Sequence, residues 1–425
     1  MKKLLAVFLA VAMLLSVTAS LADDTTTITL WTYPIGSWVD ETTVQGIIAN
    51  FNAAYPNIKV KVQYLDYTSG DDQVTGAIEA GTTPDIIMEG PERLVTNWGA
   101  AGKMLDLADL WTEEATADIA ATSQPVVDAC KGADGKFYEY PLCMTTHTMT
   151  INLQYFEKAD ALKYIDQETR TWTTENFIEA CKALAAAGYI PGVVYCGGQG
   201  GDQGTRALVN NLYSGKFTNA DHTAYTADSE ENLKGLTLLQ QMVNDGILNA
   251  DPAIVASDEI ALFCNGTVAM GFCWNAAAAV SNKASLADTV TSFPMAFPSD
   301  DGTPELCGGI WGFGIFDNGD AARAEAAKTF IRFVCDDAAQ GPQSVYATGF
   351  FPVRASFGDI YAGTEKAENG EFSVFMPYLG DYYNVIPGWA AQRTEWWNLL
   401  QRVFAGGDVA TEVATYITNS NGAIQ

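Results

Sequence analysis

The sequence predicts an α/β fold built around a mostly parallel, helix-covered sheet. Strand-like segments with a two-residue period alternate along the chain with longer segments whose apolar residues recur at helical spacing. The length of 425 residues suffices for two or three domains that each bury their own core. We find no repeat, low-complexity tract or Pro/Ser-rich linker. In sheets of this kind, ligands bind beyond the carboxyl ends of the strands.

The first five elements make two β-α-β steps. A short apolar strand at 28–31 precedes a helix over about 44–55. Residues 58–64 alternate apolar with polar side chains, as in a strand with one wet face. A second helix ends at Gly81 and leads into a buried strand at 84–88.

Later elements have readable ends. We expect helices that begin after Thr173 or Thr174, after Ser229 and after Asp320, and a fourth over about 392–404. Further strands are expected at 148–152, 191–196, 267–273, 291–297 and 310–316.

Residues 1–22 are typical of a cleaved secretory signal peptide. Two lysines precede an apolar run from Leu4 to Leu15, and Ser20-Leu21-Ala22 gives the pattern that signal peptidase accepts. The run is shorter than the roughly 20 residues that a membrane span needs. Because Asp23 stands where lipoproteins carry cysteine, we expect no lipid anchor. The mature chain is expected to cross the cytoplasmic membrane and to be periplasmic or extracellular.

The chain is strongly acidic. It has 23 Lys and Arg against 51 Asp and Glu, for a formal charge of -28. Nucleic acids and anionic headgroups need basic clusters that displace their counterions. We therefore do not expect nucleic acid as a partner.

The eight cysteines leave two possibilities open. An even number in an exported chain permits a disulfide framework. Small buried thiols in a protein from a reducing habitat are the alternative. The sequence does not fix any pairing.

Motifs of catalysis and cofactor binding are missing. There is no His-Glu-x-x-His, Cys-x-x-Cys, Gly-x-Ser-x-Gly or phosphate-binding loop, and His147 and His222 are the two histidines. The glycine-rich stretch 197–204 has glutamine where a dinucleotide-binding turn requires its third glycine. We expect no catalytic residue, no cofactor and no metal. Paired carboxylates such as Glu89 and Glu92 would suit a glycosidase, but 51 acidic residues make such pairs common.

Aromatic residues in loops are the most distinctive feature. Phe, Trp and Tyr make 11% of the chain. Several stand beside polar residues or glycines outside the expected core: Tyr33, Trp38, Trp274, Trp311 and Trp389. Sugar rings stack on such side chains while their hydroxyls take hydrogen bonds. Amines bind them through cation–π contact.

A series of local patterns follows along nearly the whole mature chain. In order they are 28–31, Phe51 with 55–60, 81–87, 105–107, 135–141, 151–152 with Phe156, 171–173, 263–270, 308–309, 330–333 and 349–352. The ordered series resembles family 1 of the extracellular solute-binding proteins of ABC importers, in its maltose-binding-protein-like carbohydrate branch.

The resemblance implies a two-lobe periplasmic-binding-protein-like fold of type II, with a ligand cleft between lobes joined by hinge crossovers. By analogy the crossovers fall at about 140–147, 293–297 and 340–346. The N-terminal lobe would comprise 23–143 plus 295–341, and the C-terminal lobe 147–292 plus 346–425. Ligand contacts to both lobes would stabilise a closed form that the importer recognises.

The resemblance also implies ligand-binding residues in the N-terminal lobe. The loop from Tyr33 to Trp38 matches a binding segment. Glu89 stands where maltose-type members have an aromatic residue, and Glu92 with Arg93 matches their acid–arginine pair. The glutamate at position 89 puts maltose itself in doubt.

Further residues carry over near the C-terminal lobe. Trp274, beside Asn275, matches a tryptophan that serves as a stacking platform, and Trp311 follows the Gly-Gly that borders the cleft. Trp389 and Arg393, four apart, match a pair that stacks and clamps. We expect Trp274→Ala to weaken binding with little loss of fold, and Arg93→Ala tests the acid–arginine pair.

The resulting hypothesis is a monomeric, non-enzymatic binding component of an ABC importer, which captures a sugar or oligosaccharide by hinge closure and delivers it to the permease subunits. Two alternatives remain. The same fold could hold a polyamine, another small solute or a metal, and an exported glycosidase is the third possibility. Turnover of oligosaccharides separates an enzyme from a binder.

Overall fold

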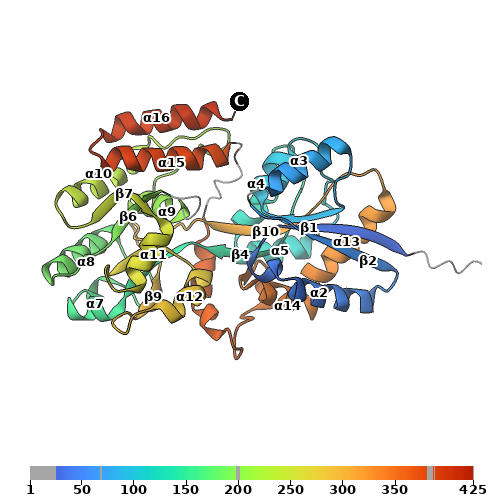
Figure 1. Cartoon of the computed structure of the whole chain (residues 1–425), viewed down its shortest axis with the longest axis horizontal. Coiled ribbons are helices and arrows are strands. Elements are labelled where there is room, and N and C mark those ends of the chain that lie inside the picture. Colours follow the sequence, from blue (N-terminus) through green and yellow to red (C-terminus); the bar gives the residue numbers. More distant parts are fainter. Residues whose placement is uncertain (1–24, 68, 198–201, 381–385, 387, 425) are drawn as a thin grey trace, which may run out of the picture.

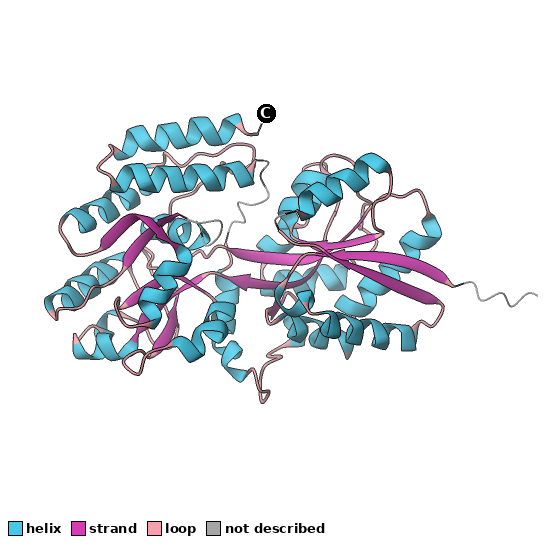
Figure 2. Ribbon diagram, in the orientation of Figure 1, coloured by secondary structure: helices cyan, strands magenta, loops and turns pink. Residues whose placement is uncertain are grey.

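The computed structural model describes residues 25–67, 69–197, 202–380, 386 and 388–424. In this part of the chain two lobes lie side by side, and strand β10 (Gly308–Ile315) runs from their junction into the first lobe (Figure 1). Helices pack around the sheets of both lobes (Figure 2). The predicted two-lobe α/β fold is confirmed.

A six-stranded sheet forms the centre of the first lobe, in the order β11-β4-β10-β3-β1-β2. β1 pairs in parallel with β2 and β3, whereas β10 runs antiparallel to β3 and β4. The prediction of a mostly parallel sheet is therefore wrong beyond β1, β2 and β3, because β10 enters from the other lobe and not through a β-α-β step. The bounds of these strands, besides β10, are β1 Thr26–Thr32, β2 Ile58–Tyr64, β3 Ile86–Glu89, β4 Tyr140–Thr146 and β11 Phe351–Pro352.

The helices of the first lobe follow the predicted pattern. α2 begins after Asp40, whose side chain accepts a hydrogen bond from the Thr43 amide at 2.8 Å, and it buries Val44, Ile47 and Phe51. The helical segments of this lobe are η1 Gly36–Val39, α2 Glu41–Ala54, α3 Gly70–Ala80, α4 Pro91–Arg93, η2 Leu94–Gly99, α5 Glu113–Thr122, α6 Gln124–Ala129, α13 Ala321–Cys335, α14 Gln340–Thr348 and η5 Ala355–Phe357.

The second lobe holds two small sheets. One has the order β8-β5-β9 with antiparallel pairing, and the other pairs β6 with β7 in parallel. Their strands are β5 Thr148–Asn152, β6 Val193–Gly197, β7 Asn249–Val255, β8 Met270–Trp274 and β9 Ser292–Met295. Around them lie α7 Leu153–Lys158, η3 Leu162–Tyr164, α8 Thr174–Ala186, α9 Asp202–Leu212, α10 Glu230–Asn244, α11 Ala256–Cys264, α12 Ala276–Asn282, η4 Lys283–Ser285, α15 Trp389–Phe404 and α16 Val409–Gly422. A further helical segment, η6 Ala367–Tyr378, contacts both lobes.

Local sequence signals located these helices well. The side chains of Thr173, Ser229 and Asp320 cap α8, α10 and α13 as predicted. The fourth predicted helix, α15, starts at Trp389, three residues before the predicted 392. No helix within the described ranges is both long and apolar enough to cross a membrane.

The chain first passes between the lobes at His147, where β4 gives way to β5. The amide of His147 donates to the carbonyl of Cys307, 2.8 Å away, so the outgoing and returning segments lie side by side. Before Cys307 the chain still packs on the second lobe, since the Asn211 side chain donates to the Glu305 carbonyl at 2.7 Å. These contacts favour a second passage after Glu305, later than the predicted 293–297.

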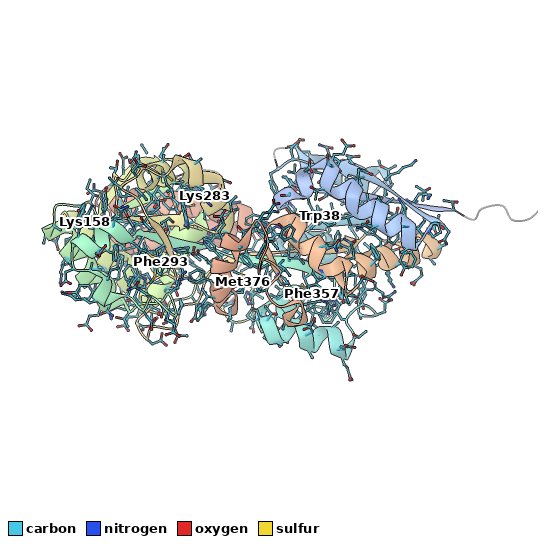
Figure 3. The ribbon with its side chains drawn as sticks, turned by 90° about the horizontal axis from the view of Figure 1, so that it is seen from below. Trp38, Lys158, Lys283, Phe293, Phe357 and Met376 are labelled. Atoms are coloured by element: carbon cyan, nitrogen blue, oxygen red, sulfur yellow. The ribbon has the colours of Figure 1, made fainter. Side chains whose placement is uncertain are left out.

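The third passage is also later than predicted. Trp38 donates from Nε1 to the Ser344 carbonyl at 3.3 Å, and β11 pairs with β4, so 340–352 belongs to the first lobe. η6 then bridges the lobes, with Asn369 bonded to Gly349. Figure 3 places Met376 at the junction. In place of the boundaries predicted at 295, 341 and 346, we propose lobes of about 25–146 plus 308–357 and 148–305 plus 389–424.

Candidate functional site

Arg93 is the centre of a polar group on the first lobe. Its Nε and Nη2 donate to the two carboxylate oxygens of Asp71 at 2.7 and 3.0 Å. The guanidinium carbon lies 5.0 Å from the ring centroid of Tyr33 and 5.5 Å from that of Tyr67. The two rings stack with centroids 5.2 Å apart, and the Tyr33 hydroxyl donates to Asp71 at 2.5 Å. Tyr67 and Asp71 were not predicted as site residues, because only the tertiary fold brings them close to Arg93 in α4.

Glu89 and Glu92 lie on the other side of the same guanidinium. Nη1 of Arg93 is 3.3 Å from Glu89 Oε1 and 4.0 Å from Glu92 Oε1. Burial raises the pKa of Glu89 despite the attraction of Arg93. Burial, followed by repulsion from Glu89, raises the pKa of Glu92 to about 8. The predicted acid–arginine pair is thus one part of a larger group with an excess of carboxylates.

Glu139 is a third buried carboxylate near this group, just before β4. Its side chain is fully buried, and neither carboxylate oxygen has a hydrogen-bond partner in the described part of the chain. Burial, with smaller contributions from Glu92 and Glu89, holds the pKa of Glu139 well above its ordinary value. In the sequence, the position of Glu139 between Tyr138 and Tyr140 was the one signal that its carboxylate is buried among apolar groups.

Trp389 and Arg393 approach from the second lobe, on the first turns of α15. The guanidinium carbon of Arg393 lies 5.0 Å from the ring centroid of Trp389, so this predicted pair stacks. The positive charge of Arg393 lowers the pKa of Glu92, opposing the larger effects of burial and Glu89. The charge of Arg393 in the second lobe therefore acts on the Glu92 carboxyl of the first lobe.

Trp274 and Asn275 lie at the end of β8, and the structure places both in structural contacts. The ring of Trp274 is 1% exposed and packs edge-on against Phe263, with centroids 5.3 Å apart. Its Nε1 has no hydrogen-bond partner among the described residues. Asn275 caps α12 by accepting from the Ala278 amide at 2.8 Å. Because the ring is buried, we now expect Trp274→Ala to lower the stability of the fold as well.

Trp311 and Trp38 do not join the group around Arg93. Trp311 is half-buried and stacks on Phe350 with centroids 4.7 Å apart. A side chain at Gly309 would come within 2.1 Å of the Trp311 ring, which explains the glycine. Trp38 is fully buried and packs against Phe313 in the first-lobe core. In the predicted loop from Tyr33 to Trp38, Tyr33 lies next to Arg93, whereas Trp38 belongs to the core.

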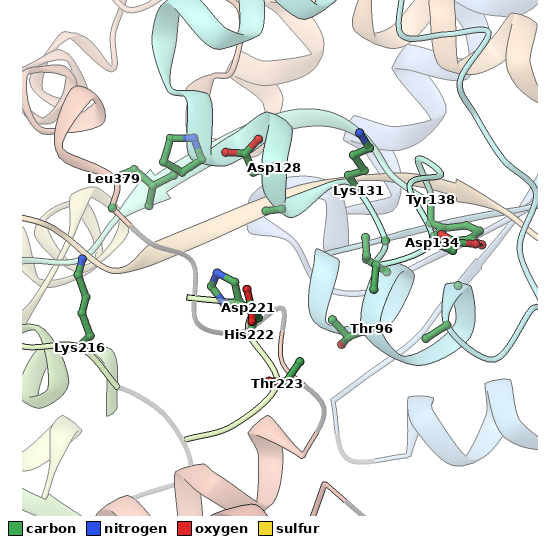
Figure 4. A pocket seen from close by; sticks show the side chains of 18 of the residues that line it. Thr96, Asp128, Lys131, Asp134, Tyr138, Lys216, Asp221, His222, Thr223 and Leu379 are labelled. Atoms are coloured by element: carbon green, nitrogen blue, oxygen red, sulfur yellow. The ribbon is translucent and has the colours of Figure 1, made fainter. Parts of the chain in front are cut away.

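A cavity of about 1060 Å³ lies beside this group and is walled by both lobes (Figure 4). None of the ten predicted binding residues lines it. The first lobe contributes η2, α6 and the segment up to Tyr138, and the second contributes the loop around His222 and the segments near Glu305 and Leu379. Its polar lining includes Thr96, Asp128, Lys131, Asp134, Lys136, Lys216, Asp221, His222, Thr223 and Glu305.

Other sequence features give little chemistry. All eight cysteines are free thiols, seven of them buried. The described residues contain no group of three or more His, Cys, Asp or Glu that could hold a metal ion. Residues 198–201 of the glycine-rich stretch lie outside the described residues, between β6 and α9.

Comparison with known proteins identifies a family and similar solved structures. The profile of the bacterial extracellular solute-binding proteins matches residues 46–372. A search of curated proteins gave no match.

Solved structures share the fold over nearly the full length. The sugar-binding protein MalE of Xanthomonas citri has a TM-score of 0.75 at 15% identity, covering 94% of this chain and 97% of its own. A solute-binding protein of Thermotoga lettingae bound to α-D-tagatose has a TM-score of 0.68 at 19% identity, with 94% and 100% covered. An ABC substrate-binding protein of Listeria monocytogenes in complex with cycloalternan has a TM-score of 0.65 at 20% identity, with 94% and 98% covered.

Proposed function

Because the chain belongs to the family of bacterial extracellular solute-binding proteins, we propose that it is the extracytoplasmic binding component of an ABC importer for a sugar or oligosaccharide. The ligand binds between the lobes, which close over it by hinge motion. The protein acts as a monomer, releases its ligand unchanged to the permease subunits and catalyses no reaction. Signal-directed export puts it outside the cytoplasmic membrane.

One observation supports the proposal: a cavity of about 1060 Å³ is lined by residues of both lobes, next to the predicted pair Glu92 and Arg93 in the chain. Glu92 on the first lobe also feels the charge of Arg393, which stacks on Trp389 of the second lobe. A ligand that touches both sides stabilises the closed form by as much as it prefers that form to the open one. An aromatic face beside charged hydrogen-bonding groups suits the C–H face and the hydroxyls of a sugar.

The structures with related folds support the carbohydrate class. Three of them are described as a sugar-binding protein or as complexes with tagatose or cycloalternan. Their identity to this chain is 20% or less, so they support the fold and the class of ligand and not a particular sugar.

An amine is the second candidate ligand. The first-lobe group contains Asp71, Glu89 and Glu92 around one arginine, next to the rings of Tyr33 and Tyr67. Excess carboxylates and aromatic faces together attract a cation. Arg93 already lies over both rings, however, and so occupies the place that an amine would take.

A thermal-shift screen of the chain without its predicted signal peptide tests the proposal. The panel contains mono- and oligosaccharides, polyamines and metal salts. A ligand at 100 times its dissociation constant adds about 2.7 kcal/mol to the free energy of unfolding and visibly raises the midpoint. We expect shifts with sugars and no reaction product by chromatography. A shift only with an amine or metal overturns the carbohydrate assignment, and product formation overturns the binder.

A further inference from the structure

The cavity between the lobes is lined by Val95 and Thr96, which closely follow the predicted pair Glu92 and Arg93 in the chain. Thr96, which lines the cavity, donates its hydroxyl to the Glu92 carbonyl at 2.8 Å, one helical turn from Arg93. The opposite wall comes from the second lobe, and Figure 4 shows Thr96 across from Asp221, His222 and Thr223. The cavity therefore lies one helical turn along the chain from Glu92 and Arg93, and residues of both lobes line it.

The first-lobe wall has an unusual backbone. η2 (Leu94–Gly99) is a π-helix, in which the Ala100 amide bonds to the Val95 carbonyl at 2.9 Å. Such segments are rare and often occur at functional sites. Gly99 in this segment touches the ring of Tyr138, and a side chain there would come within 2.6 Å of it. The Tyr138 hydroxyl donates to Asp134 at 2.7 Å, so the cavity has a fixed aromatic wall with a polar end.

The charges of the lining indicate an uncharged ligand. Three lysines and four acidic residues line the cavity, whereas the whole chain has 23 basic and 51 acidic residues. Several of the lining charges are paired with one another: Lys216 with Glu305, and Lys136 with Asp134 at 3.2 Å. Neither an amine nor a phosphate would find the excess of opposite charge that it needs. The carboxylate oxygens and lysine N–H groups of such pairs suit the hydroxyls of a neutral ligand.

We propose that this cavity is a distal subsite for neutral sugar units and that the ligand is an oligosaccharide. This inference rests on the proposed function. One end of the chain binds at Glu92 and Arg93, and the rest runs along η2 between Tyr138 and the loop around His222. The cavity volume of about 1060 Å³ lies slightly above the usual range for ligand sites, about 300–1,000 Å³. A single sugar ring does not fill it.

Calorimetry with sugars of increasing length tests the subsite. The probes are glucose, mannose, galactose and xylose with their linear oligomers up to the hexamer. We expect the affinity of the wild-type chain to rise about tenfold or more with length, which is about 1.4 kcal/mol. Thr96→Trp, which fills the cavity, should remove this gain and leave the affinity for the shortest bound sugar within about twofold.

Two further variants make the result decisive. Thr223→Trp fills the cavity from the second lobe, so it repeats the test if Thr96→Trp does not fold. Thr415→Trp is the matched control, because this exposed threonine makes the same backbone contact, to the Thr411 carbonyl at 3.1 Å, on α16 outside the cavity lining. Binding that is independent of length, or a full gain in both filled variants, overturns the subsite and leaves the proposed function standing. No binding by any sugar overturns both.

Discussion

The guanidinium of Arg93 holds both carboxylate oxygens of Asp71, from Nε at 2.7 Å and from Nη2 at 3.0 Å. This bidentate pair joins α3 to α4 and fixes the plane of the guanidinium over Tyr33 and Tyr67. Arg93 also neutralises part of the charge of the buried Glu89. Arg93 therefore holds the first-lobe half of the site together before any ligand binds.

Arg93→Ala should lower the free energy of unfolding by about 1–3 kcal/mol as well as weaken ligand binding, because hydrogen bonds to charged groups are lost. Arg93→Lys keeps the charge but cannot bond to both oxygens, and should rescue little of the loss. Urea unfolding and calorimetry measure the two effects. Arg332→Ala is the control, since its ion pair with Asp109 is exposed and 3.6 Å long. Equal stability of the alanine variants would contradict the role of Arg93.

Trp274→Phe separates the packing of the ring from its N–H group. Phenylalanine keeps an aromatic ring against Phe263, whereas Trp274→Ala leaves a cavity that costs about 3–5 kcal/mol. If Nε1 serves the ligand, Trp274→Phe weakens binding by about tenfold with little change in the unfolding midpoint. Calorimetry and thermal unfolding measure the two quantities. Unchanged affinity would remove Trp274 from the site.

Sequence reasoning succeeded where the physics is local. The side-chain caps at Thr173 and Ser229 bond to amides three residues on, so a sequence window contains the whole interaction. The two-residue period of β2 and the helical period of α2 are local in the same sense. The direction of β10 is not local, because it depends on which lobe the chain has just left.

The site was less predictable for the same reason. Tyr67, just before α3, and Asp71, in α3, reach Arg93 only through the tertiary fold, because both lie more than 20 residues before it in the chain. Trp38 stands beside glycine and serine in a loop, as a binding residue would, yet it fills the space above Phe313 and is fully buried. The neighbours of an aromatic residue along the chain do not decide which way its ring turns.

The cysteines should behave as eight separate thiols. Burial raises the pKa of Cys196 to about 12 and that of Cys181 further, so neither is a thiolate at neutral pH. In the native protein, a thiol reagent should modify at most Cys273, which is partly exposed. All eight should react in denaturant without reductant, and reductant should leave the unfolding midpoint unchanged. Fewer reactive thiols in denaturant would indicate disulfides.

Arg393→Gln should weaken ligand binding about tenfold with little effect on stability, because its guanidinium stacks on Trp389 at the surface of α15. Loss of its positive charge should also raise the pKa of Glu92 further. Arg393→Lys restores the charge but not the planar stack, and should recover the pKa more fully than the affinity. Calorimetry as a function of pH measures both. Identical behaviour of the two variants would contradict the stacking role.

The buried Glu92 should make the protein less stable as the pH rises. Burial and the charge of Glu89 raise its pKa to about 8, whereas in the unfolded chain it has the ordinary value of 4.5. Between these values the folded state holds a proton that the unfolded state has released, so the free energy of unfolding falls with increasing pH.

In the Glu92→Gln variant the side chain at position 92 cannot ionise. The variant should therefore lose the contribution of Glu92 to the fall of the free energy of unfolding with increasing pH. The variant should match the wild type near pH 4.5 and exceed its stability at pH 8 by about 1–3 kcal/mol. Some slope should remain, because burial also raises the pKa of Glu259 to about 8. Urea unfolding at a series of pH values gives the difference directly. A variant that is less stable than the wild type at pH 8 would mean that the charged form of Glu92 is well solvated or paired, contrary to its burial beside Glu89.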